Sequence, residues 1–257
     1  MKIAIISGAS SGMGKDFVVQ ADKRYELDEI WVIARRKERL VALQEGVKAK
    51  IVPLALDLTL PESFLEIENK IKEENPEIKL LVNCSGFGKF AEFIESDPVA
   101  NAGMCDLNLK SLILMNNLIV PYLKEGAKII NVGSLSSFEP VPHLSVYAAT
   151  KAGVLSFSRA LSFELKKKKI RVLCLCPYWV KTEFFGAANE KESLKKFDIL
   201  YESAYVVKVA YKALDKTKKD YVVPGKYAKL LRVMAKFLPH KLMMSVMGKM
   251  FKFEKHD

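Results

Sequence analysis

The sequence predicts an α/β fold, a doubly wound parallel sheet with helices on both faces, and two observations carry this prediction. Short apolar runs rich in β-branched residues recur along the 257 residues, and longer segments with helical spacing separate them. Strands that are apolar on both faces and alternate with helices are typical of parallel sheets covered on each side. Half of the residues are hydrophobic, so a chain of this length can bury a full core.

The elements follow in order along the chain. The first strand leads directly into a glycine-rich turn, which opens a helix over 12–24. Further helices are expected over 61–74 and 98–123. The last long helix covers 146–167. The expected strands are 3–6, 29–34, 50–54, 80–82, 127–132, 171–175 and, at the sheet edge, 221–223.

No linker, charge block or internal repeat divides the chain. We therefore expect a single dinucleotide-binding and catalytic domain over 1–225, followed by an amphipathic helical extension over 226–257. In this extension one helical stripe is expected to hold Tyr227, Leu230, Leu231, Met234, Phe237 and Leu238, and a second one Leu242, Met243, Val246, Met247 and Met250.

The composition excludes several classes of function. The four cysteines form no C-x-x-C motif and the three histidines are scattered, so no metal site is expected. The apolar start is too short for a signal peptide and no run approaches the roughly 18 residues that span a bilayer, which predicts a cytoplasmic protein. The net charge of +11 admits anionic partners, but no nucleic-acid-binding motif accompanies it, so nucleic acid is not an expected partner.

Residues 5–15 read IISGASSGMGK and admit three interpretations. A hydrolase nucleophile elbow, G-x-S-x-G, is excluded because no earlier strand and loop exist to supply its oxyanion hole. A P-loop is excluded because five residues instead of four separate Gly8 from Gly14, and Asp16 follows Lys15 where Ser or Thr is required. A turn that brings backbone N–H groups to a pyrophosphate at the start of a helix remains.

Two further patterns indicate chemistry at the carboxyl ends of the strands. Arg35 and Arg36 follow the second strand, where an arginine can pair with the 2′-phosphate of NADP, so NADP(H) is the expected cofactor. Tyr147 and Lys151 are one helical turn apart and share a face. A lysine cation near a tyrosine is expected to lower the pKa of the phenol towards the range that is useful for proton transfer.

Together these motifs resemble the short-chain dehydrogenase/reductase family over most of residues 2–185. The resemblance implies a single-domain Rossmann-like fold and a set of cofactor-binding residues. These are Gly8, Ser10, Ser11, Gly12, Met13, Gly14, Arg35, Arg36, Asp57, Leu58, Asn83, Gly86, Tyr147, Lys151, Pro177, Val180 and Thr182. The chain departs from the usual Asn-Asn-Ala-Gly at Cys84 and Ser85, and from the usual Pro-Gly at Tyr178.

The resemblance also implies a catalytic tetrad of Ser134, Tyr147, Lys151 and Asn108, with 13 residues from the serine to the tyrosine. In the family, the tyrosine transfers a proton to or from the substrate oxygen, and the serine hydrogen-bonds that oxygen. The lysine holds the nicotinamide ribose, and the asparagine positions a water that relays protons to the lysine. Long helices usually pair the subunits, which implies a homodimer or a homotetramer.

The substrate end is expected to be apolar. Its candidate residues are Phe87, His143, Tyr178, Phe184 and Phe185. The sequence leaves three roles open for the extension 226–257: it packs on the domain or on a partner, it lies on an anionic membrane, or it covers an apolar substrate. The expected activity interconverts a ketone and a secondary alcohol, on a bulky apolar substrate such as a steroid or a lipid. The alternatives are a 3-oxoacyl-thioester reductase and a non-catalytic NADP(H) sensor.

Overall fold

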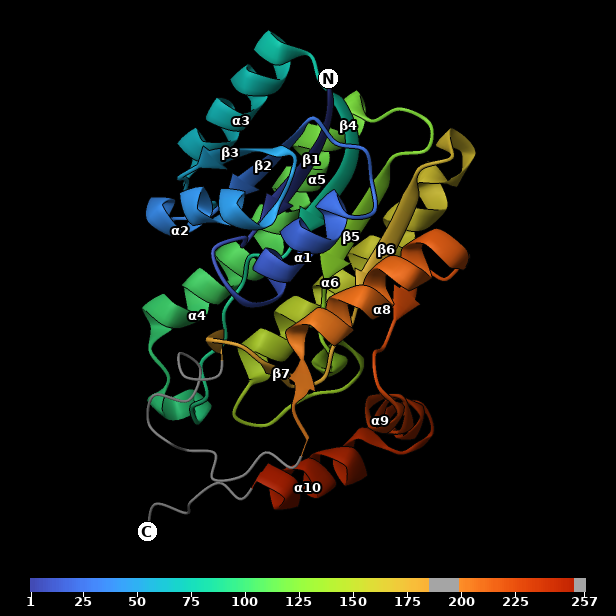
Figure 1. Ribbon diagram of the computed structural model, residues 1–257. Helices are drawn as coiled ribbons and strands as arrows, with labels where there is room; N and C mark the ends of the chain where they lie inside the picture. The colour runs from blue at the N-terminus through green and yellow to red at the C-terminus, as the bar shows by residue number, and fades with distance from the viewer. Residues whose placement is uncertain (185–198, 252–257) are drawn as a thin grey trace.

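A seven-stranded parallel sheet forms the centre of the protein (Figure 1). The computed structural model describes residues 1–184 and 199–251, with the backbone alone for 246–251. The sheet order is β3-β2-β1-β4-β5-β6-β9. The strands are β1 (Lys2–Ser7), β2 (Glu29–Ile33), β3 (Lys50–Leu54), β4 (Glu77–Asn83), β5 (Lys128–Val132), β6 (Arg171–Leu175) and β9 (Tyr221–Val222). This arrangement confirms the doubly wound fold and the seven predicted strands.

Helices cover both faces of the sheet because its strands are apolar on both sides. One face packs against α1 (Gly12–Asp22), α2 (Lys37–Val41) and α8 (Ser203–Lys216), whose buried side chains include Phe17, Leu40 and Tyr211. The other face packs against α3 (Pro61–Glu74) and α5 (Ser111–Ile119) through side chains such as Ile67 and Met115. The helix α6 (Ser145–Glu164) packs along β6 on the same side as α5.

The predicted helix over 98–123 is interrupted. It consists of α4 (Pro98–Cys105), a π-helical turn over Asp106–Lys110 and α5, and it ends in a 3₁₀ turn at Val120–Tyr122. The widened turn contains Asn108, whose side chain is completely buried. Such π-turns are frequent at functional sites because they re-aim the residues of one helical turn. The predicted helix is therefore present, and the π-helical turn within it is a feature that the sequence did not indicate.

The chain after β6 wraps around the carboxyl end of the sheet. Two short strands, β7 (Val180–Lys181) and β8 (Tyr201–Glu202), form a separate parallel pair. Two helices follow β9, α9 (Lys226–Phe237) and α10 (His240–Phe251), and both lie below the sheet in Figure 1. Within the described residues no helix is long and apolar enough to cross a membrane.

The predicted apolar stripe of the extension is only partly buried. Leu231 packs inward with Ala228 and Ala235, whereas Leu230 and Phe237 are exposed to solvent. The helix α9 thus buries a narrow face of Ala228, Leu231 and Ala235 and leaves other large apolar side chains at its surface. The side chains of Val246, Met247 and Met250 lie outside the described part of the structure.

Candidate active site

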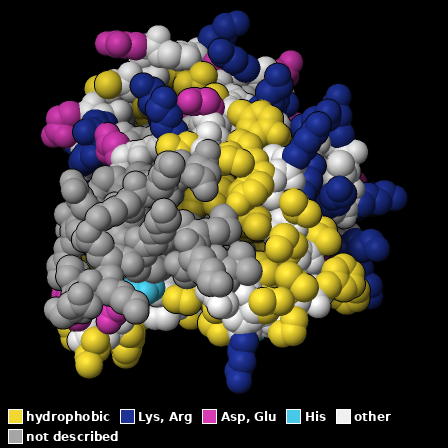
Figure 2. Space-filling view, turned by 90° about the horizontal axis from the view of Figure 1, so that it is seen from below, with side chains coloured by type: hydrophobic (Ala, Val, Ile, Leu, Met, Phe, Trp, Pro, Cys, Tyr) yellow, Lys and Arg dark blue, Asp and Glu magenta, His cyan; other side chains and the backbone are white. Residues whose placement is uncertain are grey.

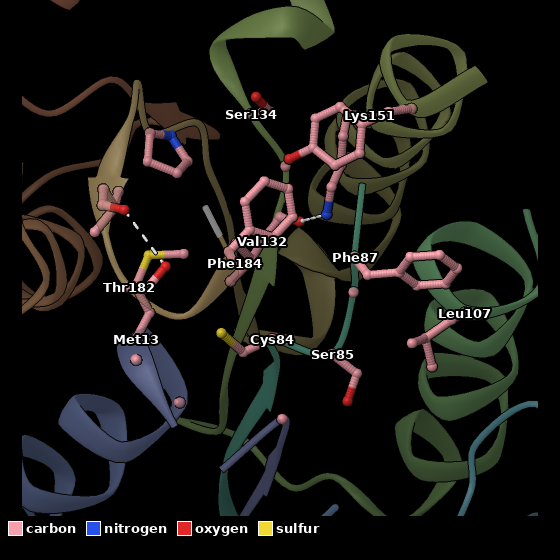
Figure 3. Close-up of a pocket in the computed structure, with 18 of the residues that line it drawn as sticks. Met13, Cys84, Ser85, Phe87, Leu107, Val132, Ser134, Lys151, Thr182 and Phe184 are labelled. Atoms are coloured by element: carbon pink, nitrogen blue, oxygen red, sulfur yellow. Dashed lines mark hydrogen bonds between the residues drawn. The ribbon is translucent and has the colours of Figure 1, made fainter. Parts of the chain in front are cut away.

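A cavity of about 450 Å³ lies at the carboxyl ends of the central strands. Its walls come from the turn after β1, the segments after β2, β4 and β5, the start of α6, and α9 and α10. Ligands of doubly wound sheets bind at this edge, where the strand order reverses beside the first strand. Most of the residues that the sequence pointed to line this one cavity (Figure 3).

The glycine turn is shaped by close approaches of the backbone. A Cβ atom on Gly14 would lie 1.9 Å from the carbonyl oxygen of Gly8. Gly8 has φ +69°, and a Cβ there would lie 2.8 Å from the backbone carbonyl of Cys84. Gly12, with φ +51°, begins α1 and lies against Thr182. Only glycine fits these three positions, and the turn leaves the N-terminus of α1 facing the cavity, where backbone N–H groups favour an anion.

The two arginines of the predicted 2′-phosphate site differ in their surroundings. Arg36 donates to the hydroxyls of Ser10 and Ser11, at 3.1 and 3.2 Å, so it closes over the glycine turn. Arg35 is mostly exposed, and its guanidinium lies 4.0 Å from a carboxylate oxygen of Asp57. Arg36 is therefore the better placed of the two to meet a phosphate held near this turn.

A carboxylate that lines this end of the cavity, Glu183, also contacts a third arginine. Glu183 accepts from Arg36 at 3.0 Å and from Arg39 at 2.5 Å. Hydrogen bonds from these two arginines hold the pKa of the Glu183 carboxyl below its usual value, and the bond from Arg39 has the larger effect. Sequence reasoning missed Arg39, although it follows Arg36 by three residues at the start of α2 and therefore shares its side of the helix. It also missed Glu183.

Tyr147 and Lys151 lie on the cavity side of α6, and both are buried. The Lys151 ammonium donates to the carbonyl oxygen of Val132 at 2.8 Å, as Figure 3 shows, and lies 5.6 Å from the centre of the Tyr147 ring. Ser134 follows β5 and caps the turn η5 (Leu135–Phe138), with its hydroxyl accepting from the Ser136 N–H. The Ser134 side chain also lies close to the Tyr147 phenol and acts to lower its pKa. The structure thus brings Ser134, Tyr147 and Lys151 together.

Burial determines the titration of this group. It raises the pKa of Tyr147 to about 12, although the nearby Ser134 side chain acts in the opposite direction. It lowers the pKa of Lys151 to about 8. A lowering of the phenol pKa by Lys151 is not seen in this arrangement, in which burial raises that pKa and the ammonium donates to the Val132 carbonyl oxygen.

Asn108 lies behind the cavity wall. Its side-chain amide donates to the Phe87 carbonyl oxygen at 2.8 Å and its carbonyl accepts from the Phe87 N–H at 2.9 Å. A Cβ on Gly86 would lie 2.8 Å from the Asn108 oxygen and 3.5 Å from the Lys151 ammonium. Asn108 therefore fixes the loop after β4 next to Lys151, a role in positioning that the π-turn makes possible.

The remaining predicted residues fall into two groups. Along the cavity lie Met13, Leu58, Gly86, Phe87, Pro177, Tyr178, Val180, Thr182 and Phe184. Asn83 does not line it: its side chain donates to Asn131 between β4 and β5 at 2.9 Å. His143 does not line it either and borders a small neighbouring hollow, and Phe185 lies outside the described residues.

The end of the cavity away from the glycine turn is mostly apolar. Val141, Leu144 and Phe184 surround Tyr147 there, and the Phe184 ring centre lies 5.7 Å from that of Tyr147. The extension also contributes to this end, through Leu231 of α9 and Met243 of α10. Of the alternatives for the extension, the structure shows a contact with the domain, because α9 and α10 supply part of the cavity wall.

Among the described residues no cluster of three or more His, Cys, Asp or Glu side chains could hold a metal ion. One carboxyl group does stand in the apolar end, that of Glu139, which follows the turn η5. Sequence reasoning missed it, because nothing in the pattern around Glu139 distinguishes it from a surface residue. Burial raises the pKa of the Glu139 carboxyl to about 7.

The sequence pattern of the short chain dehydrogenase family matches residues 2–193. The chain belongs to this family. Members of the short-chain dehydrogenase family are oxidoreductases, and the cavity described above lies where a doubly wound sheet binds a dinucleotide. An uncharacterised oxidoreductase of Staphylococcus saprophyticus is 28% identical, over 80% of this chain and 91% of its own length.

Two longer relatives are very-long-chain 3-oxoacyl-CoA reductases. The mouse protein is 30% identical over 94% of this chain and 78% of its own length. The rat protein is 32% identical over 75% of this chain, and the match spans 63% of the rat protein's length. Both relatives are therefore longer than the part that this chain matches.

Solved structures agree with the fold over the whole chain. A short-chain dehydrogenase from Sphingobium yanoikuyae in complex with NADPH has a TM-score of 0.78 and 25% identity, and the match covers 100% of this chain and 98% of that one. A bulky-bulky ketone specific alcohol dehydrogenase from Comamonas testosteroni has a TM-score of 0.73 at 23% identity, over 100% of this chain and 96% of that one. The second likeness supports the fold alone.

Proposed function

We propose that this short-chain dehydrogenase is an NADP(H)-dependent enzyme that interconverts a ketone and a secondary alcohol on a bulky apolar substrate. The observation that carries the proposal is the convergence of Ser134, Tyr147 and Lys151 between a polar end and an apolar end of one cavity. A hydride donor fits the polar end of the cavity, and a hydrophobic ketone fits the apolar end. The hydride donor and the ketone carbonyl would then meet beside the Tyr147 phenol.

The polar end fits NADP(H). The glycine turn leaves no space for a Cβ and exposes the start of α1 to a pyrophosphate. Arg36, held by Ser10 and Ser11, would pair with the 2′-phosphate, with Arg39 as a second cation. When bound there, the nicotinamide ring supplies the hydride.

The chain's own groups handle the proton and the developing charge. With its pKa raised to about 12, the Tyr147 phenol carries its proton at neutral pH and can donate it to the substrate oxygen during reduction. The Ser134 hydroxyl, next to the phenol, can donate a hydrogen bond to the same oxygen as negative charge develops. Lys151, with a pKa of about 8, remains mostly cationic at pH 7 and favours a phenolate formed after proton transfer.

A 3-oxoacyl-thioester reductase is the second candidate. The match to the mouse very-long-chain 3-oxoacyl-CoA reductase covers 94% of this chain, so it reaches into the extension after residue 225. An extension of this kind is therefore compatible with an acyl-thioester reductase. A long acyl chain and a polycyclic ketone are both apolar enough for a wall that includes Leu231 and Met243.

The test is a substrate panel followed by loss of NADPH absorbance. The panel contains polycyclic ketones, simple cyclic ketones and 3-oxoacyl-CoA thioesters of increasing chain length, each with NADPH and with NADH. Turnover of bulky ketones with NADPH supports the proposal, and turnover restricted to the thioesters favours the second candidate. Binding of NADPH without turnover of any member would contradict both and favour a sensor. Assembly as a homodimer or homotetramer stays a prediction, to be measured by sedimentation velocity.

A further inference from the structure

The carboxyl group of Glu139 has an unusual place for a charged side chain. Glu139 follows η5, five residues after Ser134, and lines the cavity together with Val141, Leu231 and Met243. Only 6% of its surface is exposed. Its Oε2 atom has no hydrogen-bond partner in the described part of the chain.

No cation neutralises this group among the described residues. Glu139 takes part in none of the salt bridges that they form. Arg232 of α9 lies close to the preceding residue, 4.5 Å above the Phe138 ring; one terminal nitrogen donates to the Tyr221 hydroxyl, and its buried Nε has no hydrogen-bond partner among the described residues. A buried carboxyl without a partner is costly in a folded protein, and such groups often have a functional reason. Because burial favours the protonated form, Glu139 can act as a donor or an acceptor near neutral pH.

We propose that Glu139 binds a hydroxyl group of the substrate, at a second point apart from the reacting ketone. This inference rests on the proposed function, and it narrows the substrate class to apolar ketones that also carry a hydroxyl. A hydroxyl can both donate to the free Oε2 atom and accept from a protonated carboxyl. A site built to hydrogen-bond a substrate hydroxyl discriminates strongly against the analogue without it, because the buried partner is then left unpaired.

The experiment compares a bicyclic ketone with its regioisomeric hydroxylated derivatives. In the wild-type protein, at least one regioisomer is expected to exceed the parent ketone in kcat/KM by about tenfold or more. Glu139→Leu should abolish this preference, so that the hydroxylated and parent ketones are reduced with similar kcat/KM, and Glu139→Gln should retain part of it. The preference should reside mainly in KM, since Glu139 does not touch the reacting atoms. The absence of any preferred regioisomer, or a preference that survives in Glu139→Leu, would overturn the proposal.

A melting measurement separates this inference from the proposed function. Glu139→Leu is expected to raise Tm at pH 7, because an apolar side chain of similar size removes the cost of an unpaired carboxyl. A lower Tm would show that Glu139 has a stabilising contact and would overturn the inference. If the wild-type protein reduced no ketone in the panel, the proposed function would fail, and the Tm comparison would still decide whether the carboxyl is unpaired.

A different observation carries a second inference, about the exposed face of α9. Leu230, Val233 and Phe237 follow one another at helical spacing along α9, and all three are more than half exposed. Exposed lysines lie beside them at Lys226, Lys229 and Lys236. Figure 2 shows apolar side chains gathered on this side of the molecule, with Lys and Arg side chains along its edge.

The charge of this segment points to the occupant of the face. Residues 221–251 contain six Lys and Arg and no Asp or Glu. A second copy of the same face would bring like charges together, whereas an anionic lipid surface is complementary to both the lysines and the apolar side chains. The opposite side of α9 lines the cavity through Leu231, and α10 does so through Met243.

We propose that the exposed face of α9, which carries Leu230, Val233 and Phe237, lies on an anionic lipid surface. There the cavity wall would be next to a reservoir of apolar compounds. Basic amphipathic helices bind such surfaces through their buried apolar area and their attraction to anionic headgroups.

The test is co-sedimentation with phosphatidylcholine vesicles that contain or lack phosphatidylglycerol. The wild-type protein should bind the anionic vesicles at least about tenfold more tightly, and salt should weaken this binding. Leu230→Ser/Phe237→Ser should lose the binding. The matched control Leu65→Ser/Phe163→Ser, which changes exposed apolar residues of α3 and α6, should keep it. Equal binding by both double variants, or no binding by the wild type, would overturn the proposal. The proposal would also be overturned if sedimentation velocity showed a dimer that Leu230→Ser/Phe237→Ser dissociates and the control variant does not.

Discussion

The two ends of the cavity are built by different means. The polar end uses a short continuous motif, in which Gly8, Gly12 and Gly14 leave no space for side chains and Arg36 closes over the turn. The apolar end draws single residues from distant segments, such as Glu139 after β5 and Leu231 in α9. Substitutions at the polar end should therefore affect every substrate, and those at the apolar end only some. Tyr147 and Lys151 stand between the two.

The largest effect is expected where the two ends meet. Tyr147→Phe removes the proton donor but keeps the ring and its contact with Phe184. It should lower kcat by at least about 100-fold for every substrate, because general acid catalysis contributes on this order or more. Steady-state rates and NADPH titration measure this, and the Kd for NADPH should not change. Tyr122→Phe, outside the cavity, is the matched control. Substantial turnover by Tyr147→Phe would remove the phenol from the mechanism.

The next effect tests the polar end alone. Arg36→Ala should reduce kcat/KM for NADPH by about tenfold or more, about 1.4 kcal/mol, and leave NADH nearly unaffected. The wild-type protein should prefer NADPH by at least the same factor. Arg35→Ala is the comparison, since that side chain is mostly exposed and faces Asp57. If both variants lost the preference equally, the distinction between the two arginines would be incorrect.

A smaller, selective effect is expected at the apolar end. Leu231→Ala and Met243→Ala enlarge the cavity, and they should lower kcat/KM by at least about fivefold for bulky ketones, since a methylene group in an apolar pocket is worth about 1–3 kcal/mol. Small cyclic ketones should be reduced at the wild-type rate. An equal loss for small and large ketones would mean that these side chains serve only folding.

At the polar end, a substitution of Glu183 should strengthen cofactor binding, whereas the other substitutions lower activity. Its carboxylate occupies Arg36 and Arg39, the same cations that a 2′-phosphate would need. Glu183→Gln should therefore tighten binding of NADPH a few-fold, since exposed ion pairs are worth about 0–1 kcal/mol. Isothermal titration with adenosine 2′,5′-bisphosphate reports the same contact without turnover. Weaker binding would indicate that Glu183 orients the arginines for the phosphate.

The pH dependence of folding stability gives a separate test at the Glu139 carboxyl group. The pKa of Glu139 is raised to about 7, above its value in the unfolded chain. Between about pH 4.5 and 7 the unfolded chain releases this proton first, so the contribution of Glu139 to stability declines as pH rises. Urea unfolding across this range should show a steeper decline for the wild type than for Glu139→Gln. Parallel curves would contradict the raised pKa.

The strands and the glycine turn were predictable because they depend on local rules. A run such as 3–6 is apolar on both faces, and a turn such as 8–14 has its own steric requirement. The pairing of Tyr147 with Lys151 was predictable for the same reason, because one helical turn relates them. The interruption at Asn108 was not, since it depends on hydrogen bonds to Phe87 in another loop.

The sequence by itself determined the doubly wound sheet, the phosphate-binding turn and the residues on one side of α6, since each follows from spacing within a few residues of the chain. Only the tertiary structure decided that Arg36 and not Arg35 meets the turn, that Asn83 faces Asn131, and that Glu139 stands in an apolar cavity. It also decided that burial, more than the nearby ammonium, determines the pKa of Tyr147. The physical reason is the same in each case: solvent exclusion and contacts between segments far apart in the chain arise only when the chain is folded.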